Sequence, residues 1–309
     1  MNTLHFKYAV EVERTRSITQ AAENLFMAQP NLSKAIKELE DTLGITIFER
    51  TSKGVIPTAK GAEFLVYAKN VLEQLDKMEQ LYIPEDTERQ HFKISIPRGS
   101  YIAHAFTRFA AELDADKQID VGVQETNSMQ TIASVAEGQF DLGIIRYQTD
   151  YENYFLDYLA EKGLQYEPIW EFEYLALMSQ QHPLAAAEKV RYDDLRQYVE
   201  IVHGDTAIPY LPASKVNRSE SNKKCIYVYE RSSQFDMLSH IPSTYMWVSP
   251  IPESFLELYG LVQRKCRAAN HKYKDLLICP KGYSFTALDR RFIDQLYASK
   301  NEVAFRQYD

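Results

Sequence analysis

The strongest constraint on the fold of this chain is a pair of short helical patterns separated by a tight turn, within residues 17–44. The second pattern forms one apolar stripe at spacings of four, three and four residues: Leu32, Ile36, Leu39 and Leu43. Pro30 fits the first turn of such a helix, because the N–H that proline lacks would have no intrahelical acceptor there. Gly44 fits the helix end. The patterns predict two helices joined by a turn at about residues 26–28.

The flanking sequence extends this pair into a small domain. An earlier helix is predicted by apolar residues that recur every four positions, namely Leu4, Tyr8 and Val12. We expect Ser17 and Gln20 to form a capping box at the start of the next helix. Two apolar segments, residues 45–48 and 55–56, enclose a basic segment that contains a glycine. They predict a two-stranded wing with a basic tip.

The polar side of the second helix carries groups that suit DNA recognition. A helix-turn-helix unit places its second helix in the major groove, with the first residues of that helix toward the base edges. Glutamine and asparagine can bond adenine, and lysine reaches guanine or phosphate. The candidate DNA-binding residues are Ile18, Thr19, Gln29, Pro30, Asn31, Ser33, Lys34, Lys37, Arg50 and Lys53. The alternatives are a helical subdomain with a solvated basic face and a helix-turn-helix that contacts another protein.

The distribution of charge is compatible with a DNA partner, although the net charge of the chain is −8. Residues 1–60 carry eight Lys/Arg and seven Asp/Glu, whereas the remaining residues carry 27 basic and 36 acidic side chains. DNA affinity depends on where the cations sit, because each phosphate that is neutralised releases a counterion. The acidity therefore lies outside the segment that would bind DNA.

Residues 58–83 predict one long amphipathic helix. Its apolar residues follow a heptad seam at spacings of four and three: Phe64, Ala68, Val71, Leu75, Met78 and Tyr82. Because a helix of this length needs a partner to cover its apolar side, we expect it to pair with a second copy of the chain. Packing against its own chain is the alternative. A polar linker at residues 84–88 ends the helix.

From residue 91 onward, strands alternate with helices. Strands at residues 92–96, 119–123 and 140–145 enclose helices at about 101–113 and 128–138, which predicts a parallel βαβαβ arrangement. Further strands follow at residues 174–178, 199–202, 226–229, 245–248 and 276–278, with a last helix near 286–298. We expect an α/β protein with domains at 1–58, 59–89 and 90–309. The last would have a first lobe (about 90–165 and 267–309) and a second lobe (about 166–266).

Small polar residues and arginines follow the predicted strands of both lobes. In open α/β sheets, ligands bind at the carboxyl ends of strands, near helix N-termini that favour anions. Arg146 could clamp a carboxylate through two hydrogen bonds. The candidate ligand-binding residues are Arg98, Gly99, Ser100, Thr126, Asn127, Ser128, Arg146, His203, Gly204, Arg231, Ser232 and Ser249. The alternative is that these residues are ordinary helix caps and surface arginines.

Residues 17–40, SITQAAENLFMAQPNLSKAIKELE, resemble the winged helix-turn-helix of LysR-type transcriptional regulators. Residues 44–50 and 57–61 are similar to the wing and to the entry of the linker helix in that family, and residues 141–146 and 182–184 resemble later patterns. The resemblance implies a winged helix-turn-helix, a dimerising linker helix and a two-lobed effector domain of the periplasmic-binding-protein type (type 2), usually in a tetramer. It implies as partners double-stranded DNA, a small-molecule effector, and further copies of the chain in a homodimer or homotetramer. It places effector contacts at the loops named above, and we expect a small anionic metabolite.

Two positions depart from the family pattern. Ala28 stands where serine is commoner, so the recognition helix lacks a side-chain cap worth about 1 kcal/mol. Residues 239–247 replace a stretch that is usually rich in glycine and alanine. The second departure bears on the shape of the second lobe.

Other functional classes find less support in the sequence. The three cysteines lack metal-ligand spacing and indicate reduced thiols, so we expect neither a metal nor a cofactor. The motifs His-Glu-x-x-His, Gly-x-Ser-x-Gly and the glycine-rich phosphate loop are absent, which argues against an enzyme. The N-terminus does not resemble a signal peptide, and no apolar run of roughly 18 residues could span a membrane. We therefore expect a cytoplasmic protein. Its rivals are a solute-binding module without DNA function and an enzyme on the same two-lobed scaffold.

Overall fold

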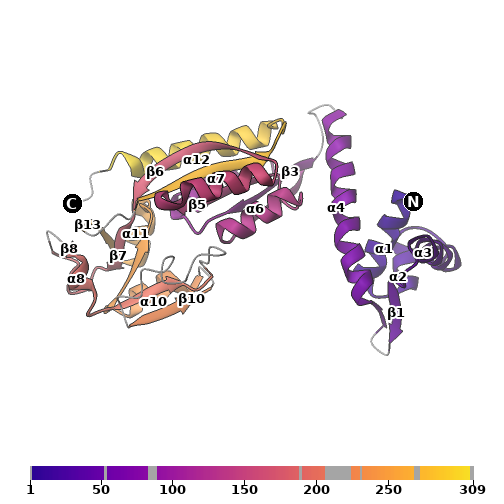
Figure 1. Cartoon of the computed structure of the whole chain (residues 1–309), viewed down its shortest axis with the longest axis horizontal. Helices are drawn as coiled ribbons and strands as arrows, with labels where there is room; N and C mark the ends of the chain where they lie inside the picture. Colours follow the sequence, from indigo (N-terminus) through magenta and orange to yellow (C-terminus); the bar gives the residue numbers. More distant parts are fainter. Residues whose placement is uncertain are drawn as a thin grey trace. The chain divides into compact units, whose positions relative to one another are not determined.

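The computed structural model describes residues 2–51, 54–82, 89–187, 190–205, 224–229, 232–267 and 272–306. The chain divides into two compact units, Met1–Thr87 and Glu88–Asp309. We call them the N-terminal unit and the C-terminal unit. Figure 1 labels the helices and strands of both. The polar linker expected at residues 84–88 lies outside the described residues.

The N-terminal unit contains the helix-turn-helix and the wing that the sequence predicts. Its elements are α1 (Thr3–Thr15), α2 (Ile18–Asn24), α3 (Gln29–Leu43), β1 (Phe48–Thr51), β2 (Gly54–Pro57) and α4 (Ala59–Tyr82). The strands of the wing pair antiparallel. One apolar core joins the helices and the wing, and it includes Phe6, Val12, Leu32, Leu39, Ile47 and Leu65.

Local side-chain and backbone geometry sets the helix ends. Ser17 caps α2 by accepting a hydrogen bond from the Gln20 N–H at 3.3 Å. The Gln20 side chain donates instead to Glu23 and Asn24, so the reciprocal half of the expected capping box is absent. Gly44 ends α3 in the left-handed region at φ 67°, as the sequence predicts. Ala28 provides no side-chain cap for α3.

Part of the heptad seam on α4 packs within its own unit. Leu65 and Ala68 are buried in the core, and Phe64 and Leu72 pack against it. On the other sides of the helix and toward its end, the exposed apolar side chains are Val66, Tyr67, Val71 and Met78. The alternative of packing on its own chain therefore applies to the first turns of α4, and pairing with a second copy stays a prediction for the exposed side chains. The side chain of Tyr82 lies outside the described residues.

The first sheet of the C-terminal unit has the order β4-β3-β5-β14-β6. Its elements are β3 (Arg89–Ile96), α5 (Ser100–Ala111), β4 (Gln118–Glu125), α6 (Ser128–Ala136), β5 (Leu142–Gln148), α7 (Glu152–Glu161), β6 (Leu164–Glu173), β14 (Lys272–Pro280) and α12 (Ala287–Ala304). Strand β3 pairs parallel with β4 and β5, which confirms the βαβαβ prediction. Helices α5 and α12 pack on one face, and α6 and α7 pack on the other (Figure 1).

The second sheet has the order β10-β9-β11-β7-β12. Its lobe contains β7 (Leu175–Ser179), β8 (Val190–Arg191), α8 (Tyr192–Leu195), β9 (Val199–His203), β10 (Cys225–Val228), α10 (Ser232–His240), β11 (Thr244–Val248), α11 (Glu253–Tyr259), β12 (Leu261–Arg264) and β13 (Cys266–Arg267). Strands β9, β10 and β11 are parallel to one another, whereas β7 runs antiparallel to β11. The sequence therefore located β7, β9, β10 and β11 within one or two residues at each end, and it gave no prediction for β8, β12 and β13.

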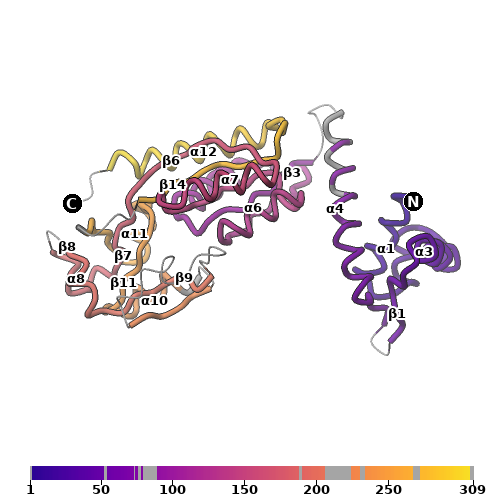
Figure 2. Tube along the Cα trace, in the orientation of Figure 1, coloured from indigo at the N-terminus to yellow at the C-terminus, as the bar shows by residue number. Residues whose placement is uncertain are grey.

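The chain crosses from the first sheet to the second later than the sequence suggested. Strand β6 pairs with β14 along its whole length, so residues 164–173 belong to the first lobe. The expected border at about 166 is wrong for this reason, and Tyr174 is the residue between the two sheets. The trace in Figure 2 follows this passage from β6 into the second lobe. The Tyr174 ring stacks on Tyr273 of β14, with 3.7 Å between the ring centroids.

Three further observations concern the described residues as a whole. None of their helices is long and apolar enough to cross a membrane. Cys225, Cys266 and Cys279 are free thiols. No cluster of three or more His, Cys, Asp or Glu side chains among the described residues could hold a metal ion.

Candidate functional site

Helix α3 presents a polar side opposite the core. It buries Leu32, Ala35, Ile36 and Leu39. Of the predicted DNA contacts on this helix, Pro30, Asn31, Lys34 and Lys37 are exposed, and Gln29 and Ser33 are partly buried on its flank. The side that the sequence assigned to DNA therefore faces away from the core of its own unit.

On this side, Lys34 forms only a long, exposed ion pair within the described part of the chain. Lys34 Nζ lies 3.8 Å from Glu38 Oε1, and the two side chains are 78% and 53% exposed. An exposed pair of this length contributes little to stability. A phosphate oxygen can therefore replace Glu38 at small cost.

The remaining candidates of the N-terminal unit flank α3. Thr19 is exposed in the first turn of α2, and Arg50 is exposed on β1. Ile18 is partly buried and lines a groove between α3 and the wing. Lys53 lies outside the described residues.

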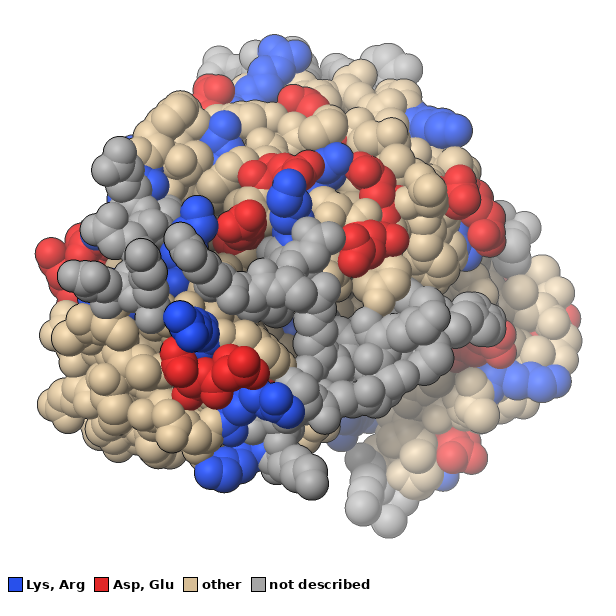
Figure 3. Space-filling model, turned by 60° about the vertical axis from the view of Figure 1, so that its left-hand side comes forward, with Lys and Arg blue, Asp and Glu red and all other residues tan. Residues whose placement is uncertain are grey.

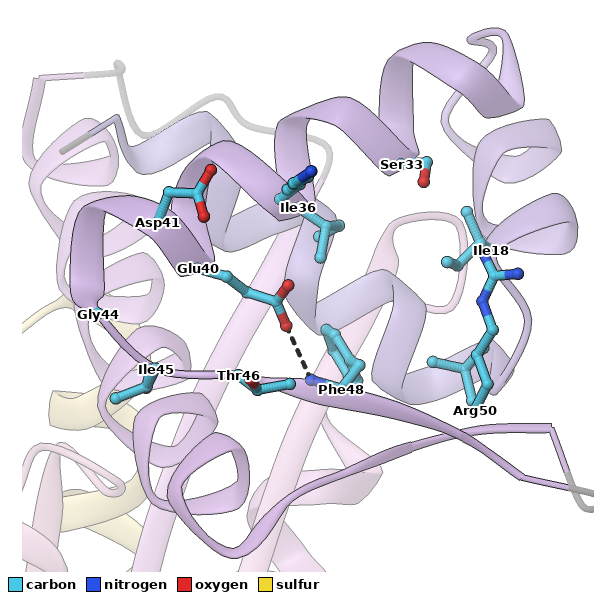
Figure 4. Close-up of a pocket in the computed structure, with 12 residues that line it drawn as sticks. Ile18, Ser33, Ile36, Glu40, Asp41, Gly44, Ile45, Thr46, Phe48 and Arg50 are labelled. Carbon is cyan, nitrogen blue, oxygen red and sulfur yellow. Dashed lines mark hydrogen bonds between the residues drawn. The ribbon is translucent and has the colours of Figure 1, made fainter.

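The groove between α3 and the wing has a volume of about 570 Å³. Glu40 crosses from α3 toward the wing, as the dashed line in Figure 4 marks. Its Oε1 accepts hydrogen bonds from the backbone N–H groups of Ile47 at 2.6 Å and Phe48 at 3.1 Å. This carboxylate fixes the start of β1 against the recognition helix. The sequence analysis missed Glu40, although a carboxylate beside the apolar stripe and just before a turn is a usable signal.

In the C-terminal unit, Arg98 joins the two lobes. It lies in the loop between β3 and α5 and forms two parallel hydrogen bonds with Asp205, just beyond β9. Nη1 to Oδ1 and Nη2 to Oδ2 both measure 2.8 Å. Arg98 Nη2 also donates to the backbone carbonyl of Tyr229, at 2.8 Å. The Arg98 and Asp205 side chains are 12% and 26% exposed.

The positive charge of Arg146 is paired with a carboxylate of the protein interior. Its Nε and Nη2 donate to the two carboxylate oxygens of Asp275, both at 2.7 Å, and Nη1 donates to Ser249 of the second lobe at 3.0 Å. The Asp275 side chain is 0% exposed and also accepts from the Tyr101 hydroxyl. Burial opposes the charge on Arg146, but Asp275 outweighs it and raises the pKa of the guanidinium. The Arg146 guanidinium therefore already holds a carboxylate.

Strand register explains this pairing. Arg146 on β5 lies directly opposite Asp275 on the antiparallel strand β14. Residues in such positions have side chains on the same face of the sheet and about 5 Å apart. The sequence predicted that Arg146 could clamp the carboxylate of a ligand, but its guanidinium already holds Asp275. The sequence alone did not show that β14 pairs with β5 and brings Asp275 to this position.

The small polar candidates of the first lobe have local roles. Asn127 caps α6 by accepting from the Gln130 N–H at 2.9 Å. The Ser128 hydroxyl bridges to Arg146, donating to its carbonyl at 2.6 Å and accepting from its N–H at 3.0 Å. The Thr126 N–H donates to the Ile96 carbonyl at 2.9 Å. The alternative of an ordinary helix cap therefore describes Asn127, whereas Thr126 and Ser128 bond the backbone of neighbouring strands.

Glycines allow the loops at the ends of the strands to approach one another. A Cβ on Gly99, the N-cap of α5, would lie 2.9 Å from Arg146 Nη2. A Cβ on Gly204 would lie 2.6 Å from the Tyr229 ring. The region thus brings together five of the predicted residues: Arg98, Gly99, Arg146, Gly204 and Ser249.

The other candidates are placed as follows. Ser100 is buried in the first turn of α5. His203 is partly buried at the end of β9. Ser232 begins α10, but its side chain and the whole of Arg231 lie outside the described residues.

The acidic partners of these arginines were not among the predicted site residues. Asp205 follows His203 and Gly204 directly, so its place at the end of β9 was open to inference. Asp275 gave no such signal, because its role depends on the pairing of distant strands. Among the described side chains on the face drawn in Figure 3, basic and acidic groups lie interspersed.

Comparison with known proteins places this arrangement in a family. Residues 4–62 match the family described as "Bacterial regulatory helix-turn-helix protein, lysR family", and residues 85–298 match "LysR substrate binding domain". The probable RuBisCO transcriptional regulator of Thalassiosira pseudonana is 30% identical over 178 residues, which are 56% of this chain and 55% of the relative. The chain thus spans about half the length of that relative.

Two further proteins align over more of the chain. The transcriptional regulator AlsR of Bacillus subtilis (strain 168) is 23% identical over 266 residues, 84% of this chain and 83% of AlsR. The structure of full-length CbnR complexed with its target DNA superposes with a TM-score of 0.64 at 14% identity, over 97% of this chain and 100% of CbnR. The latter likeness is one of fold. Because the LysR substrate binding domain by itself matches more than half of the residues, the chain belongs to the LysR family of bacterial transcriptional regulators.

Proposed function

We propose that this protein regulates transcription by binding duplex DNA through α3 and the wing, and that a small molecule bound between the two lobes controls it. The observation that carries the first half is the polar side of α3, which stays exposed while the opposite side forms the core. A helix held in this way can enter a major groove without rearrangement of its own unit. Regulation of this kind needs no catalytic step, and it takes place in the cytoplasm, where the DNA is.

We propose separate roles for the candidate DNA contacts. Gln29, Asn31 and Ser33 lie in the first turns of α3, where side chains reach base edges. Lys34 and Lys37 neutralise phosphates, and Thr19 and Arg50 hold the backbone on either side of the groove. Glu40 positions the wing that carries Arg50.

We propose that the protein acts as a homodimer through α4, with a homotetramer as the complete assembly. The exposed apolar side chains Val66, Tyr67, Val71 and Met78 support this proposal, because water contact with them is unfavourable and a second α4 would remove it. A dimer would offer two recognition helices to a site with two similar halves.

We propose a small anion as the effector, with Arg98 as the cation that faces it. Arg98 lies at the carboxyl end of β3 and at the start of α5, a position at which open α/β sheets bind ligands. Arg146 is better described as a structural residue, since Asp275 and Ser249 occupy its donors.

The DNA proposal is tested with the double variant Lys34→Ala/Lys37→Ala and a fragment selected from genomic DNA by the wild-type protein. We expect weaker binding and a smaller salt dependence, with the slope of log affinity against log salt concentration reduced by about 1 to 2, because each phosphate contact contributes about 0.9. Fluorescence anisotropy at several salt concentrations measures this slope.

The matched control is Lys162→Ala/Lys300→Ala, which removes two charges from the C-terminal unit. It should leave the slope unchanged. A wild-type slope in the α3 variant would remove both lysines from the DNA interface.

A further inference from the structure

The contact between Arg98 and Asp205 has the geometry of a bound ligand. Two parallel hydrogen bonds of 2.8 Å join the guanidinium edge to both oxygens of the carboxylate. This is the arrangement in which arginine recognises a free carboxylate. The two residues are separated by 107 positions and lie in different lobes. Arg98 therefore holds a carboxylate that the protein itself supplies.

The second lobe presents this carboxylate on a rigid support. Asp205 follows β9, and β9 pairs in parallel with β10 up to His203 and Val228. The Gly204 N–H continues the ladder by donating to the Val228 carbonyl at 2.9 Å. The next residue of that strand segment, Tyr229, supplies the carbonyl that also accepts from Arg98. Both acceptors for Arg98 are thus fixed by one strand pair.

The lobes remain connected when this contact opens. Ser249 of the second lobe still accepts from Arg146 at 3.0 Å. Near the passage between the sheets, Tyr174 still stacks on Tyr273. Loss of the Arg98–Asp205 contact therefore frees the ends of β9 and β10 without separating the lobes.

We propose that Asp205 is a built-in occupant of a carboxylate site on Arg98, and that a carboxylate effector displaces it. The inference rests on the proposed function and names the ligand class and the competing group. Arg98 cannot hold two carboxylates in the same two-bond geometry, so ligand binding and the contact between the lobes exclude each other. A carboxylate ligand binds only the form in which Asp205 has left Arg98. It therefore shifts the protein from the form with the Arg98–Asp205 contact to the form without it.

Competition by a small carboxylate tests this proposal without knowledge of the natural effector. The variant Asp205→Ala removes the internal carboxylate, and we expect hydrogen–deuterium exchange at Gly204 and β10 of the full-length protein to rise about tenfold, because a charge-assisted contact is lost. Formate is the smallest molecule with the same group, so sodium formate should raise the exchange of the wild-type protein toward that of Asp205→Ala, and sodium chloride at equal ionic strength should not.

Two controls make the result specific. The double variant Asp205→Ala/Arg98→Gln should show fast exchange at Gly204 and β10 with or without formate, because the cation is gone. The variant Glu302→Ala breaks a pair with Arg108 that lies within the first lobe and is more exposed, and it should leave exchange at Gly204 and β10 unchanged. Asp205→Ser provides a second vacated site should Asp205→Ala fold poorly.

The outcomes separate this inference from the proposed function. Wild-type exchange in Asp205→Ala, equal effects of formate and chloride on the wild-type protein, or an effect of formate on exchange in the double variant would each overturn the carboxylate site. Failure of the wild-type protein to bind any genomic fragment would instead contradict DNA-dependent regulation, and it would leave the formate result to be judged on its own.

Discussion

The two units of this protein differ in where they keep their polar groups. Among the described residues, every buried side chain of the N-terminal unit is apolar, whereas the C-terminal unit buries Asp275, Asp289, Glu200 and His182. Small domains have little interior, so a buried charge is harder to compensate there. The N-terminal unit thus leaves its polar groups for an external partner, and the C-terminal unit uses several of them internally.

This difference explains why the two candidate sites behaved differently as predictions. On α3 four of the expected DNA contacts are exposed, namely Pro30, Asn31, Lys34 and Lys37, and Lys34 forms only a long ion pair among the described residues. At the lobe ends, Arg98 lies in the expected loop and Arg146 lies on β5, and both already hold carboxylates. A cation found by sequence is free for a ligand only if no internal partner reaches it, and otherwise the ligand has to displace that partner.

The largest effect should follow from breaking the buried pair at Asp275. The variant Asp275→Ala leaves Arg146 charged and without its carboxylate, and we expect a loss of about 3 to 5 kcal/mol in the free energy of unfolding of the C-terminal unit. Both tryptophans of the chain, Trp170 and Trp247, lie in this unit, so urea unfolding followed by tryptophan fluorescence reports on it alone.

The comparison is sharpened by a control and by a double variant. Glu302→Ala removes an exposed partner of Arg108 and should cost within about 1 kcal/mol. Replacing both buried charges, in Arg146→Met/Asp275→Leu, should restore part of the loss, because no uncompensated charge remains. Equal unfolding curves for Asp275→Ala and the wild type would show that the C-terminal unit does not depend on its internal charges.

A smaller effect is expected at Glu40 in the N-terminal unit. Glu40→Ala removes the acceptor of the Ile47 and Phe48 N–H groups, which should cost about 1 to 2 kcal/mol, since the side chain is only partly buried. Hydrogen–deuterium exchange at these two amides should rise about tenfold. DNA affinity should fall as well, because the wing that carries Arg50 loses its attachment to α3.

Glu40→Gln is the matched control, because its side-chain oxygen can still accept both hydrogen bonds. It should retain slow exchange at Ile47 and Phe48. If Glu40→Ala also kept wild-type exchange, the wing would be held by its apolar contacts alone. The stability of the N-terminal unit would then depend on neither buried polar side chains nor this hydrogen-bonded carboxylate.

The elements that the sequence predicted well are those whose signal is contiguous. The apolar stripe of α3, its terminal Gly44 and the alternation of strands and helices each lie within a few neighbouring residues. The lobe border was misplaced because β6 is defined by its pairing with β14, about 110 residues later. The pairs Arg98–Asp205 and Arg146–Asp275 were missed for the same reason, since they join positions 107 and 129 residues apart.

The smallest effect should be a pH dependence of stability in the C-terminal unit, which arises from a buried histidine. His182 is 3% exposed, its Nδ1 accepts from the Leu184 N–H at 3.0 Å, and its ring lies 4.4 Å from that of Tyr198. Burial lowers the pKa of His182 below its ordinary value of 6.5. The unfolded chain therefore binds a proton more readily than the folded protein, and stability falls as the pH drops through 6.5 toward the lowered pKa.

We expect the urea midpoint from tryptophan fluorescence to fall between about pH 7.5 and about pH 5 in the wild type, and to fall less in His182→Asn. Asparagine can still accept from Leu184 but cannot take up a proton in this range, so the variant removes the titration and keeps the hydrogen bond. His240→Asn, at an imidazole that is 76% exposed, should retain the wild-type pH dependence. Parallel pH profiles for His182→Asn and the wild type would mean that other titratable groups set the acid sensitivity of this unit. The contrast with the N-terminal unit would then not extend to a titration of His182.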